Sequence, residues 1–282
     1  MKKIVFPSEY FNVKDTLECG QIFRFTPFEK GYKVFSLDKC AYVYNEGDTA
    51  VIFCKECDED YFSDFFDLKK NYAAIVGFAL NESEEVIKRS ASLAKGVRIL
   101  KQDATETLFS FIVSQNNNIG RIKGIIEKLC LNLGEKGEFM GEEYHAFPTI
   151  EKMSAAPVEL FKEIGLGYRA PYIKRLAEDM ENGFSLESFY SLPTPELKKK
   201  LLSVYGVGPK VADCAIFFGF NRSDAFPVDT WIEKVYREDF SGSIKDRNKI
   251  SEYFVARFKE NSGYIQQYLF YYKRTLEKKN DK

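Results

Sequence analysis

Histidine is almost absent from this chain, because His145 is the only one among 282 residues. Zinc deaminase sites and catalytic triads depend on histidine, so the sequence disfavours both classes of enzyme. Six cysteines are scattered along the chain, and only Cys54 and Cys57 have the spacing of a metal-ligand pair. A zinc or iron–sulfur site needs a second pair or histidines, so we expect free thiols and no metal site. Any catalysis would therefore depend on Lys, Asp, Glu or Tyr.

The chain also lacks an excess of charge and any long apolar run. Its 41 Lys and Arg balance 42 Asp and Glu, with a formal net charge of −1, so contact with nucleic acid would need a local basic patch. No apolar run approaches the ~20 residues of a membrane-spanning helix. Residues 1–7 end at a proline before the apolar part of a secretory signal could form. We expect no membrane partner and a cytoplasmic protein, associated with the nucleoid if it is bacterial.

The first third of the sequence is typical of a small sheet with helices. Segments rich in aromatic and β-branched residues, separated by turn formers, predict antiparallel strands at residues 21–25, 32–36, 40–44 and 50–53. After Cys57 the apolar spacing becomes helical, and we expect these helices to cover the sheet. This spacing is carried by Tyr61, Phe62, Phe65, Phe66, Ile75, Phe78 and Ala79. Residues 1–97 are therefore predicted to form an α+β domain.

Residues 98–282 are predicted to form an almost entirely helical domain. Asp103, followed three residues later by Glu106, resembles a capping box at the start of a buried helix. Helical spacing then recurs at residues 119–131, 157–164, 168–180, 195–204, 209–219, 229–239, 251–258 and 263–276. No low-complexity linker separates the two units, so we expect them to pack together. The predicted fold class is α+β, with a small antiparallel sheet followed by an all-α body.

Paired glycines occur twice between helical stretches, as Gly-Leu-Gly at residues 165–167 and Gly-Val-Gly at residues 206–208. Glycine permits a positive φ and lets the backbone approach a partner closely, so each segment predicts a helix-hairpin-helix turn. Gly-x-Gly alone is a weak signal, because in most proteins it marks only a turn.

The second of these turns precedes a lysine that could act as a nucleophile. Gly208 suits the N-cap position and Pro209 the first helical position, so Lys210 would lie in the first helical turn. The positive end of the helix dipole and partial burial both favour a neutral amine, which is the nucleophilic form. Cys214, four residues on, would share this helix face. The alternative is an ordinary surface lysine at a helix start.

Asp229 is the candidate partner of this lysine. It follows Pro227, which favours an extended approach, and it precedes an amphipathic helix that contains Ile232 and Val235. A purely structural role would be to cap that helix. A catalytic role would be to offer a fixed negative charge to a cationic transition state beside Lys210.

These residues resemble the helix-hairpin-helix DNA glycosylases with the Gly/Pro-Asp signature, and within them the 8-oxoguanine DNA glycosylase/AP lyases. The resemblance covers most of the chain and is carried by residues 20–24 (GQIFR), 116–121 (NNNIGR), 165–170 (GLGYRA), 206–214 (GVGPKVADC), 227–229 (PVD) and 266–270 (QQYLF). It implies a helical body of two lobes around an active-site cleft. It also implies that Lys210 attacks the sugar C1′, leading to β-elimination, and that Asp229 is the catalytic carboxylate.

The resemblance further implies a pocket for a base flipped out of duplex DNA. Phe270 would stack on the purine, and Gln266, at i, i+4 with Phe270, would bind its Watson–Crick edge. 8-Oxoguanine carries a hydrogen on N7 that guanine lacks, and the main-chain carbonyl of Gly20 would accept it. Cys214 would belong to the same pocket. Taken alone, Gln266 and Phe270 would be read as core residues.

Four residues would contact the opposite strand, which carries the unpaired cytosine. The resemblance implies that asparagine and arginine side chains meet the acceptors of this base, while a tyrosine wedges into the vacated stack. The residues are Asn116, Arg121, Tyr168 and Arg169. Their structural alternatives are a helix C-cap for Asn116 and solvated helix faces for the arginines.

The DNA phosphates would be bound by main-chain N–H groups of Gly206, Gly208 and Lys210. A structural monovalent cation could sit at this hairpin, and no other cofactor is implied. Two residues depart from the family pattern: Trp231 stands where many relatives have histidine, and Tyr205 where proline often precedes the hairpin glycines. No cysteine cluster follows the helical domain, which argues against the iron–sulfur branch of the superfamily.

The favoured function is excision of 8-oxoguanine from duplex DNA, preferably opposite cytosine, by a monomeric bifunctional enzyme. A monofunctional glycosylase for alkylated bases is an alternative, but it would lack the lysine. A noncatalytic helix-hairpin-helix DNA-binding module is another, but it would need neither Lys210 with Asp229 nor a pocket pair such as Gln266 and Phe270.

Overall fold

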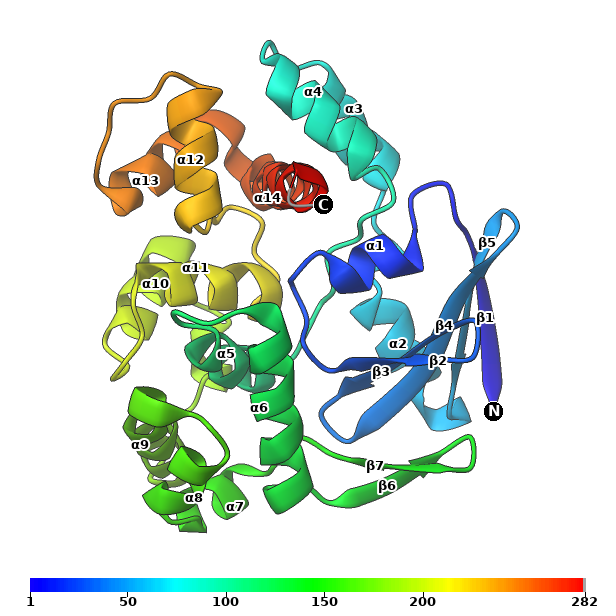
Figure 1. Ribbon diagram of the computed structural model, residues 1–282, viewed down its shortest axis with the longest axis vertical. Coiled ribbons are helices and arrows are strands. Elements are labelled where there is room, and N and C mark those ends of the chain that lie inside the picture. The colour runs from blue at the N-terminus through cyan, green and yellow to red at the C-terminus, as the bar shows by residue number, and fades with distance from the viewer. Residues whose placement is uncertain (281–282) are drawn as a thin grey trace.

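A five-stranded antiparallel sheet forms one side of the protein (Figure 1). The computed structural model describes residues 1–280, so residues 281–282 of the predicted helical domain lie outside the described residues. The strand order is β1-β5-β4-β3-β2. The bounds are β1 (Lys2–Pro7), β2 (Phe25–Phe28), β3 (Gly31–Ser36), β4 (Lys39–Glu46) and β5 (Thr49–Cys54).

Apolar side chains cover both faces of this sheet, because successive residues of a strand point to opposite sides. In β4, Ala41 and Val43 belong to one buried cluster, together with Phe62 of α2 (Glu59–Phe65). Tyr42 and Tyr44 of the same strand belong to a second cluster on the other face. The sheet is therefore the middle layer of this domain.

A hairpin that the sequence did not predict supplies the cover of the second face. β6 (Lys136–Phe139) pairs with β7 (Glu142–His145), and Phe139 and Tyr144 join the cluster of Tyr42 and Tyr44. The prediction of an almost wholly helical second domain is therefore wrong at this segment. Both strands are short and mostly polar, so they carry no apolar alternation that could have predicted them.

The predicted strand at residues 21–25 is also wrong, because β2 begins only at Phe25. Gln21 is fully buried, and its side-chain amide donates to the carbonyls of Thr16 (2.9 Å) and Arg98 (2.7 Å). Its side-chain oxygen accepts from the main-chain N–H of Leu100 at 2.8 Å. The segment is thus an extended connection, and the side chain of Gln21 ties it to Thr16 and to the backbone of residues 98–100.

Only the first of the predicted covering helices lies on the sheet. α3 (Tyr72–Leu80) buries Ile75 and Ala79 within the cluster of the helical body. α4 (Glu85–Leu93) packs against α14 (Ser262–Asn280) (Figure 1). The prediction that residues 75–79 cover the sheet is therefore wrong. Amphipathic spacing predicts a buried face but not the surface that buries it. The domain boundary near residue 97 stays a prediction.

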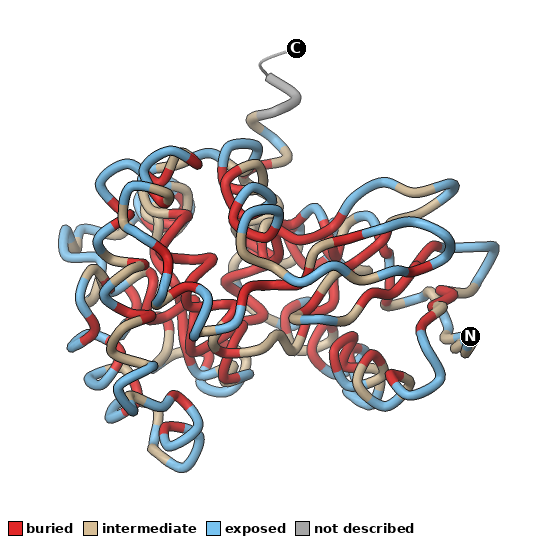
Figure 2. The backbone as a smooth tube through the Cα atoms, turned by 90° about the horizontal axis from the view of Figure 1, so that it is seen from below, coloured by how far each residue is buried: buried red, intermediate tan, exposed pale blue. Residues whose placement is uncertain are grey.

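Helices make up most of the chain after residue 103, as predicted. They are α5 (Ala104–Val113), α6 (Ile119–Leu133), α7 (Ile150–Ala155), α8 (Val158–Glu163), α9 (Ala170–Glu181), α10 (Thr194–Leu202), α11 (Pro209–Cys214), α12 (Thr230–Glu238), α13 (Arg247–Phe258) and α14. Figure 2 shows buried segments running through the interior of both halves, with exposed loops around them. The α+β fold class is confirmed. Within the described residues, no helix combines the length and apolarity needed to cross a membrane.

A buried ion pair joins the sheet to the helical body. Asp103 caps α5 by accepting from the main-chain N–H of Glu106 at 2.8 Å, as the capping pattern predicted. The carboxylate of Glu106 lies 3.1 Å from the Arg24 guanidinium and also accepts from the N–H of Leu37 at 2.6 Å. Arg24 in turn donates to the carbonyl of His145 at 2.8 Å. These bonds fix α5, which lines the site described next, against the sheet.

Candidate active site

Lys210 lies in the first turn of α11, at the position that the sequence predicted. Gly208 is the N-cap, Pro209 opens the helix, and Lys210 donates to the hydroxyl of Ser114 at 3.3 Å. Its ammonium group also lies 4.8 Å from the centroid of the Phe111 ring. The lysine is therefore directed towards α5, not out into solvent.

The turn before α11 requires glycine at one position. Gly206 has a φ of +83°, and a Cβ there would lie 2.3 Å from the Tyr172 ring. Gly208 has an extended φ of −94°, and a Cβ there would meet open space. The two hairpin glycines thus have different roles: the first fixes the turn, and the second leaves the helix N-terminus uncovered.

Asp229 is the N-cap of α12. Its Oδ1 accepts from the main-chain N–H groups of Trp231 at 3.0 Å and Ile232 at 2.9 Å. Burial raises the pKa of this carboxyl, and the two N–H donors and the nearby Lys210 act in the opposite direction. Capping occupies only Oδ1 of Asp229. The geometry is therefore compatible with both a capping role and a catalytic role for this carboxylate.

One cavity brings together all six residues predicted for catalysis and lesion binding. It is small, about 40 Å³, and its walls come from the loop before β2, from α11, from the start of α12 and from α14. The predicted residues are Gly20, Lys210, Cys214, Asp229, Gln266 and Phe270. These residues are separated by up to 250 positions in the sequence, so their meeting depends on the tertiary fold.

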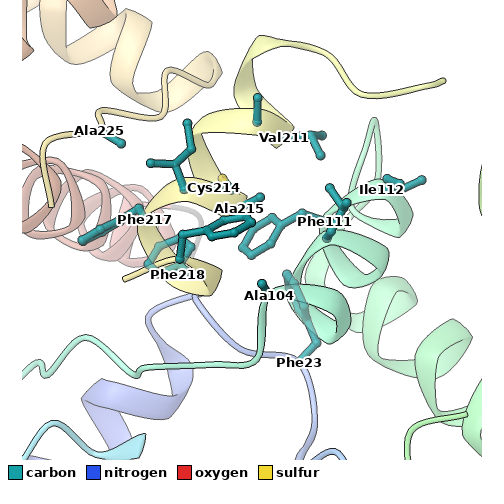
Figure 3. Close-up of a cluster of buried hydrophobic side chains, with 14 of the residues drawn as sticks. Phe23, Ala104, Phe111, Ile112, Val211, Cys214, Ala215, Phe217, Phe218 and Ala225 are labelled. Carbon is teal, nitrogen blue, oxygen red and sulfur yellow. The ribbon is translucent and has the colours of Figure 1, made fainter. Parts of the chain in front are cut away.

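Four further residues line this cavity that the sequence analysis did not assign to it: Phe111, Phe218, Pro227 and Gln267. The rings of Phe111 and Phe218 are stacked, with centroids 5.5 Å apart and planes 10° apart, and Cys214 lies beside them (Figure 3). Burial raises the pKa of the Cys214 thiol to about 12, and the charge of Lys210 opposes this. Phe111 and Phe218 lie in apolar helical runs that look like core, whereas Pro227 and Gln267 lie inside the PVD and QQYLF motifs.

Gln267 shows how the glycine loop is fixed to the last helix. Its side-chain amide donates to the carbonyl of Cys19 at 3.0 Å, so the peptide before Gly20 is held against α14. Gly20 itself has a φ of +95°, and a Cβ there would lie 3.2 Å from the Phe270 ring. The close approach of backbone and ring explains the glycine.

Three of the four residues predicted for the opposite strand lie together. Asn116, which follows α5 with a φ of +46°, donates from its side chain to the Tyr168 hydroxyl at 3.1 Å. Tyr168 is 49% exposed, which suits a wedge. Asn116 is not the C-cap of α5, because Ser114 holds that position.

Arg169 is placed differently from the expectation. It is only 4% exposed, and it donates to the carbonyls of Gln115 at 2.8 Å, Asn116 at 3.1 Å and Leu166 at 3.3 Å. Its guanidinium therefore supports the loop that carries Asn116 and is not displayed at the surface. Arg121 is exposed at the start of α6, and within the described residues its side chain has no hydrogen bond or ion pair with the other three.

Gln115 connects this loop to the hairpin, and sequence reasoning missed it. Its side-chain amide donates to the carbonyl of Gly206 at 2.8 Å, while its own carbonyl accepts from Arg169. The candidate phosphate site and the candidate opposite-strand loop are thus joined by one side chain.

Larger hollows lie outside this cavity, and two of them matter for placing the chemistry. One of about 280 Å³ lies between the sheet, α6 and the β6–β7 hairpin, and it contains none of the predicted site residues. Another, open and about 430 Å³, borders the far side of Lys210 and includes Lys245 and Arg247. In the first hollow Lys33 and Glu142 are paired with each other at 2.6 Å, whereas the smaller cavity holds all six residues predicted for catalysis and lesion binding, so we place the chemistry in the smaller cavity. Within residues 1–280, no cluster of three His, Cys, Asp or Glu residues suited to a metal is found.

Family comparisons agree with this geometry. A family model described as "HhH-GPD superfamily base excision DNA repair protein" matches residues 109–260, and one described as "8-oxoguanine DNA glycosylase, N-terminal domain" matches residues 3–108. The chain belongs to the HhH-GPD superfamily of base excision DNA repair proteins. The resemblance inferred from the sequence motifs is thereby confirmed.

The chain is also similar in sequence to curated N-glycosylase/DNA lyases. The chain is 31% identical over 245 residues to the N-glycosylase/DNA lyase OGG1 of Arabidopsis thaliana. The aligned region covers 79% of this chain and 66% of the relative. Matches to the curated relatives span 45% to 66% of their own lengths.

Solved structures match over nearly the whole chain. The 8-oxoguanine glycosylase/lyase of Clostridium acetobutylicum, in complex with double-stranded DNA containing cytosine opposite 8-oxoguanine, is 36% identical with a TM-score of 0.91 and covers 95% of this chain and 93% of that one. MBOgg1, in complex with a low-affinity DNA ligand, is 35% identical with a TM-score of 0.92 and covers 98% and 97%.

Proposed function

We propose that this protein is a bifunctional 8-oxoguanine DNA glycosylase and AP lyase. The observation that carries this proposal is the single cavity that holds Lys210, Asp229, Gly20, Gln266 and Phe270. The protein's similarity to the 8-oxoguanine glycosylase/lyase of Clostridium acetobutylicum supports the same function.

Lys210 and Asp229 would divide the chemistry between them. Cleavage of the glycosidic bond releases the base with its bonding electron pair and leaves positive charge on the sugar, which the Asp229 carboxylate would stabilise. The Lys210 amine would form a bond to C1′, and loss of the ring oxygen from C1′ would give a Schiff base. Loss of a proton from C2′ and of the 3′ phosphate would then cleave the strand by β-elimination.

The pocket residues would recognise the flipped lesion. Phe270 offers a stacking face, Gln266 offers amide groups to the Watson–Crick edge, and the Gly20 carbonyl would accept the N7–H of 8-oxoguanine. Gln266 Oε1 supports this assignment, because it is buried without a hydrogen-bond partner within the described residues. A base could supply that partner.

DNA contacts would flank this pocket on both sides. The N–H groups near Gly206 and Gly208 would bind a phosphate, with or without a monovalent cation. Lys245 and Arg247 line the adjoining hollow and could reach the DNA backbone from there. Tyr168 would occupy the gap left by the lesion opposite cytosine. We further propose that the enzyme acts as a monomer in the compartment that holds the DNA.

The test is covalent trapping with a duplex that carries one 8-oxoguanine opposite cytosine. Borohydride should trap the unmodified protein on this DNA, and Lys210→Gln should lose both the adduct and excision while still binding the duplex. A duplex carrying 3-methyladenine serves as the comparison. Excision of the alkylated base without an adduct would instead favour a monofunctional glycosylase, and binding without any excision would favour a DNA-binding module.

A further inference from the structure

One face of α14 carries three residues at successive four-residue intervals: Gln266, Phe270 and Arg274. The first two line the cavity described above. Arg274 is only 7% exposed. Its position one turn beyond Phe270 places it along the same face of the helix.

Arg274 has a buried donor without a partner. Its Nη2 donates to the carbonyl of Glu18, but Nη1 has no hydrogen-bond partner within the residues that the structure describes. Burial lowers the pKa of this guanidinium, and the thiol of Cys19 and the carboxylate of Asp229 are among the groups that oppose this. Buried donors are nearly always satisfied in native proteins, so this one calls for a ligand.

The unpaired nitrogen lies close to two residues that line the lesion pocket, Gly20 and Phe270. A Cβ built on Gly20 would be 2.9 Å from Arg274 Nη1 and 3.2 Å from Phe270 Cε1. The guanidinium carbon lies 5.3 Å from the centroid of the Phe270 ring. Nη1 therefore lies between the glycine backbone and the ring on which a flipped base would stack.

We propose that Arg274 is a specificity residue that donates from Nη1 to the C8 carbonyl oxygen of the flipped 8-oxoguanine. This inference rests on the proposed function. With the Watson–Crick edge turned towards Gln266, the opposite edge of the purine, which carries N7–H and the C8 carbonyl, faces the Arg274 end of the helix. Eight residues of helix span about 12 Å, which accommodates a purine with a hydrogen bond of about 2.9 Å at each end.

This contact adds a second means of rejecting guanine. The Gly20 carbonyl tests for the hydrogen on N7, whereas Arg274 tests for the oxygen on C8. Guanine has a C–H group at C8, so it leaves the charged donor unpaired in a buried site. Hydrogen bonds to charged groups are stronger than neutral ones, so the arginine contributes more to discrimination than a neutral donor would.

The test compares two lesions in single-turnover excision opposite cytosine: 8-oxoguanine and 8-thioguanine, which keeps N7–H but has sulfur, a weaker acceptor, in place of the C8 oxygen. Arg274→Met removes the donors and keeps an unbranched apolar side chain. It should slow excision of 8-oxoguanine about tenfold or more and reduce the preference for 8-oxoguanine over 8-thioguanine by a similar factor. Lys273→Met is the matched control, because Lys273 pairs with Glu238 at 2.6 Å on another face of α14. It should change neither rate.

Equal slowing of both lesions by Arg274→Met would overturn the proposal and leave the arginine as a support for the end of α1 (Val13–Glu18). An unchanged rate on 8-oxoguanine would overturn it as well. Should Arg274→Met fail to fold, Arg274→Lys decides: the proposal expects a shorter cation to lower the 8-oxoguanine preference at least threefold, and an unaltered preference refutes it. Absence of 8-oxoguanine excision by the unmodified protein would refute the proposed function, and this contact with it.

Discussion

Replacing Asp229 by asparagine separates its catalytic role from its structural one. Oδ1 of Asp229 accepts from the N–H groups of Trp231 and Ile232, and an asparagine oxygen can accept both hydrogen bonds in the same geometry. The substitution therefore keeps the N-cap of α12 and removes only the negative charge. Any loss of excision in this variant is then a loss of charge.

The expected magnitudes differ sharply between rate and stability. Loss of one preorganised group that stabilises developing charge slows a reaction by roughly 10²- to 10³-fold, so we expect that reduction for Asp229→Asn. Because burial raises the pKa of Asp229, its ionised form destabilises the folded state as pH rises through that pKa. Asparagine carries no such penalty, so unfolding at neutral pH should cost the variant at least as much free energy as the unmodified protein.

Asp246 provides the matched control for this experiment. It caps α13 in the same way, by accepting from the N–H groups of Asn248 at 2.7 Å and Lys249 at 3.2 Å. Asp246→Ala and Asp229→Ala should each lower the unfolding free energy by about 1 kcal/mol, but only the second should abolish excision. Denaturant unfolding and single-turnover excision measure the two effects. Near-normal excision by Asp229→Asn would refute the reasoning and leave Asp229 as a cap alone.

Four other expectations follow from the same geometry. Because burial raises the pKa of Asp229, excision should fall on acidification at a higher pH than an ordinary aspartate would give, as a rate profile would show. Phe270→Ala should weaken lesion binding by about 1 to 3 kcal/mol, whereas a loss of roughly 3 to 5 kcal/mol in unfolding free energy with unchanged activity would identify a core residue. Gly206→Ala should destabilise the fold and weaken DNA binding, since its Cβ would lie 2.3 Å from a ring, while Gly208→Ala should leave stability unchanged. Excision should favour cytosine over adenine by about tenfold or more, since one unpaired buried donor costs about 1 to 3 kcal/mol, and Arg169→Ala should reduce that ratio indirectly, because Arg169 holds the loop that carries Asn116; equal cutting of both pairs would contradict the assignment.

Local chemistry made the centre of the site predictable from the sequence. Pro209 and Gly208 define a helix start, so Lys210 had to lie in its first turn, and Pro227 with an amphipathic helix made Asp229 an N-cap. Each of these inferences depends on neighbours within a few positions. The structure adds that these elements meet at one cavity with Gly20, and only the motif resemblance had indicated that meeting.

What the sequence could not reveal is the direction in which long side chains turn. Arg169 was expected to face a cytosine, but its guanidinium donates to the carbonyls of Gln115 and Asn116. Arg274 lay outside every motif, and its hydrogen-bond partner, the carbonyl of Glu18 at the end of α1, is far from it in the sequence. Helical spacing fixes the face of a helix on which a side chain starts, whereas its hydrogen bonds depend on segments that the spacing does not report.

Gln115 joins the hairpin at Gly206 to the loop that carries Asn116. Its amide holds the carbonyl of Gly206, and its own carbonyl is held by Arg169, whose guanidinium also supports Asn116. A phosphate drawn to the hairpin and a base opposite the lesion would therefore act on two ends of one hydrogen-bonded unit. Displacement of either end would strain the bonds of this residue, so we expect docking of the lesion strand and inspection of the opposite strand to be physically linked.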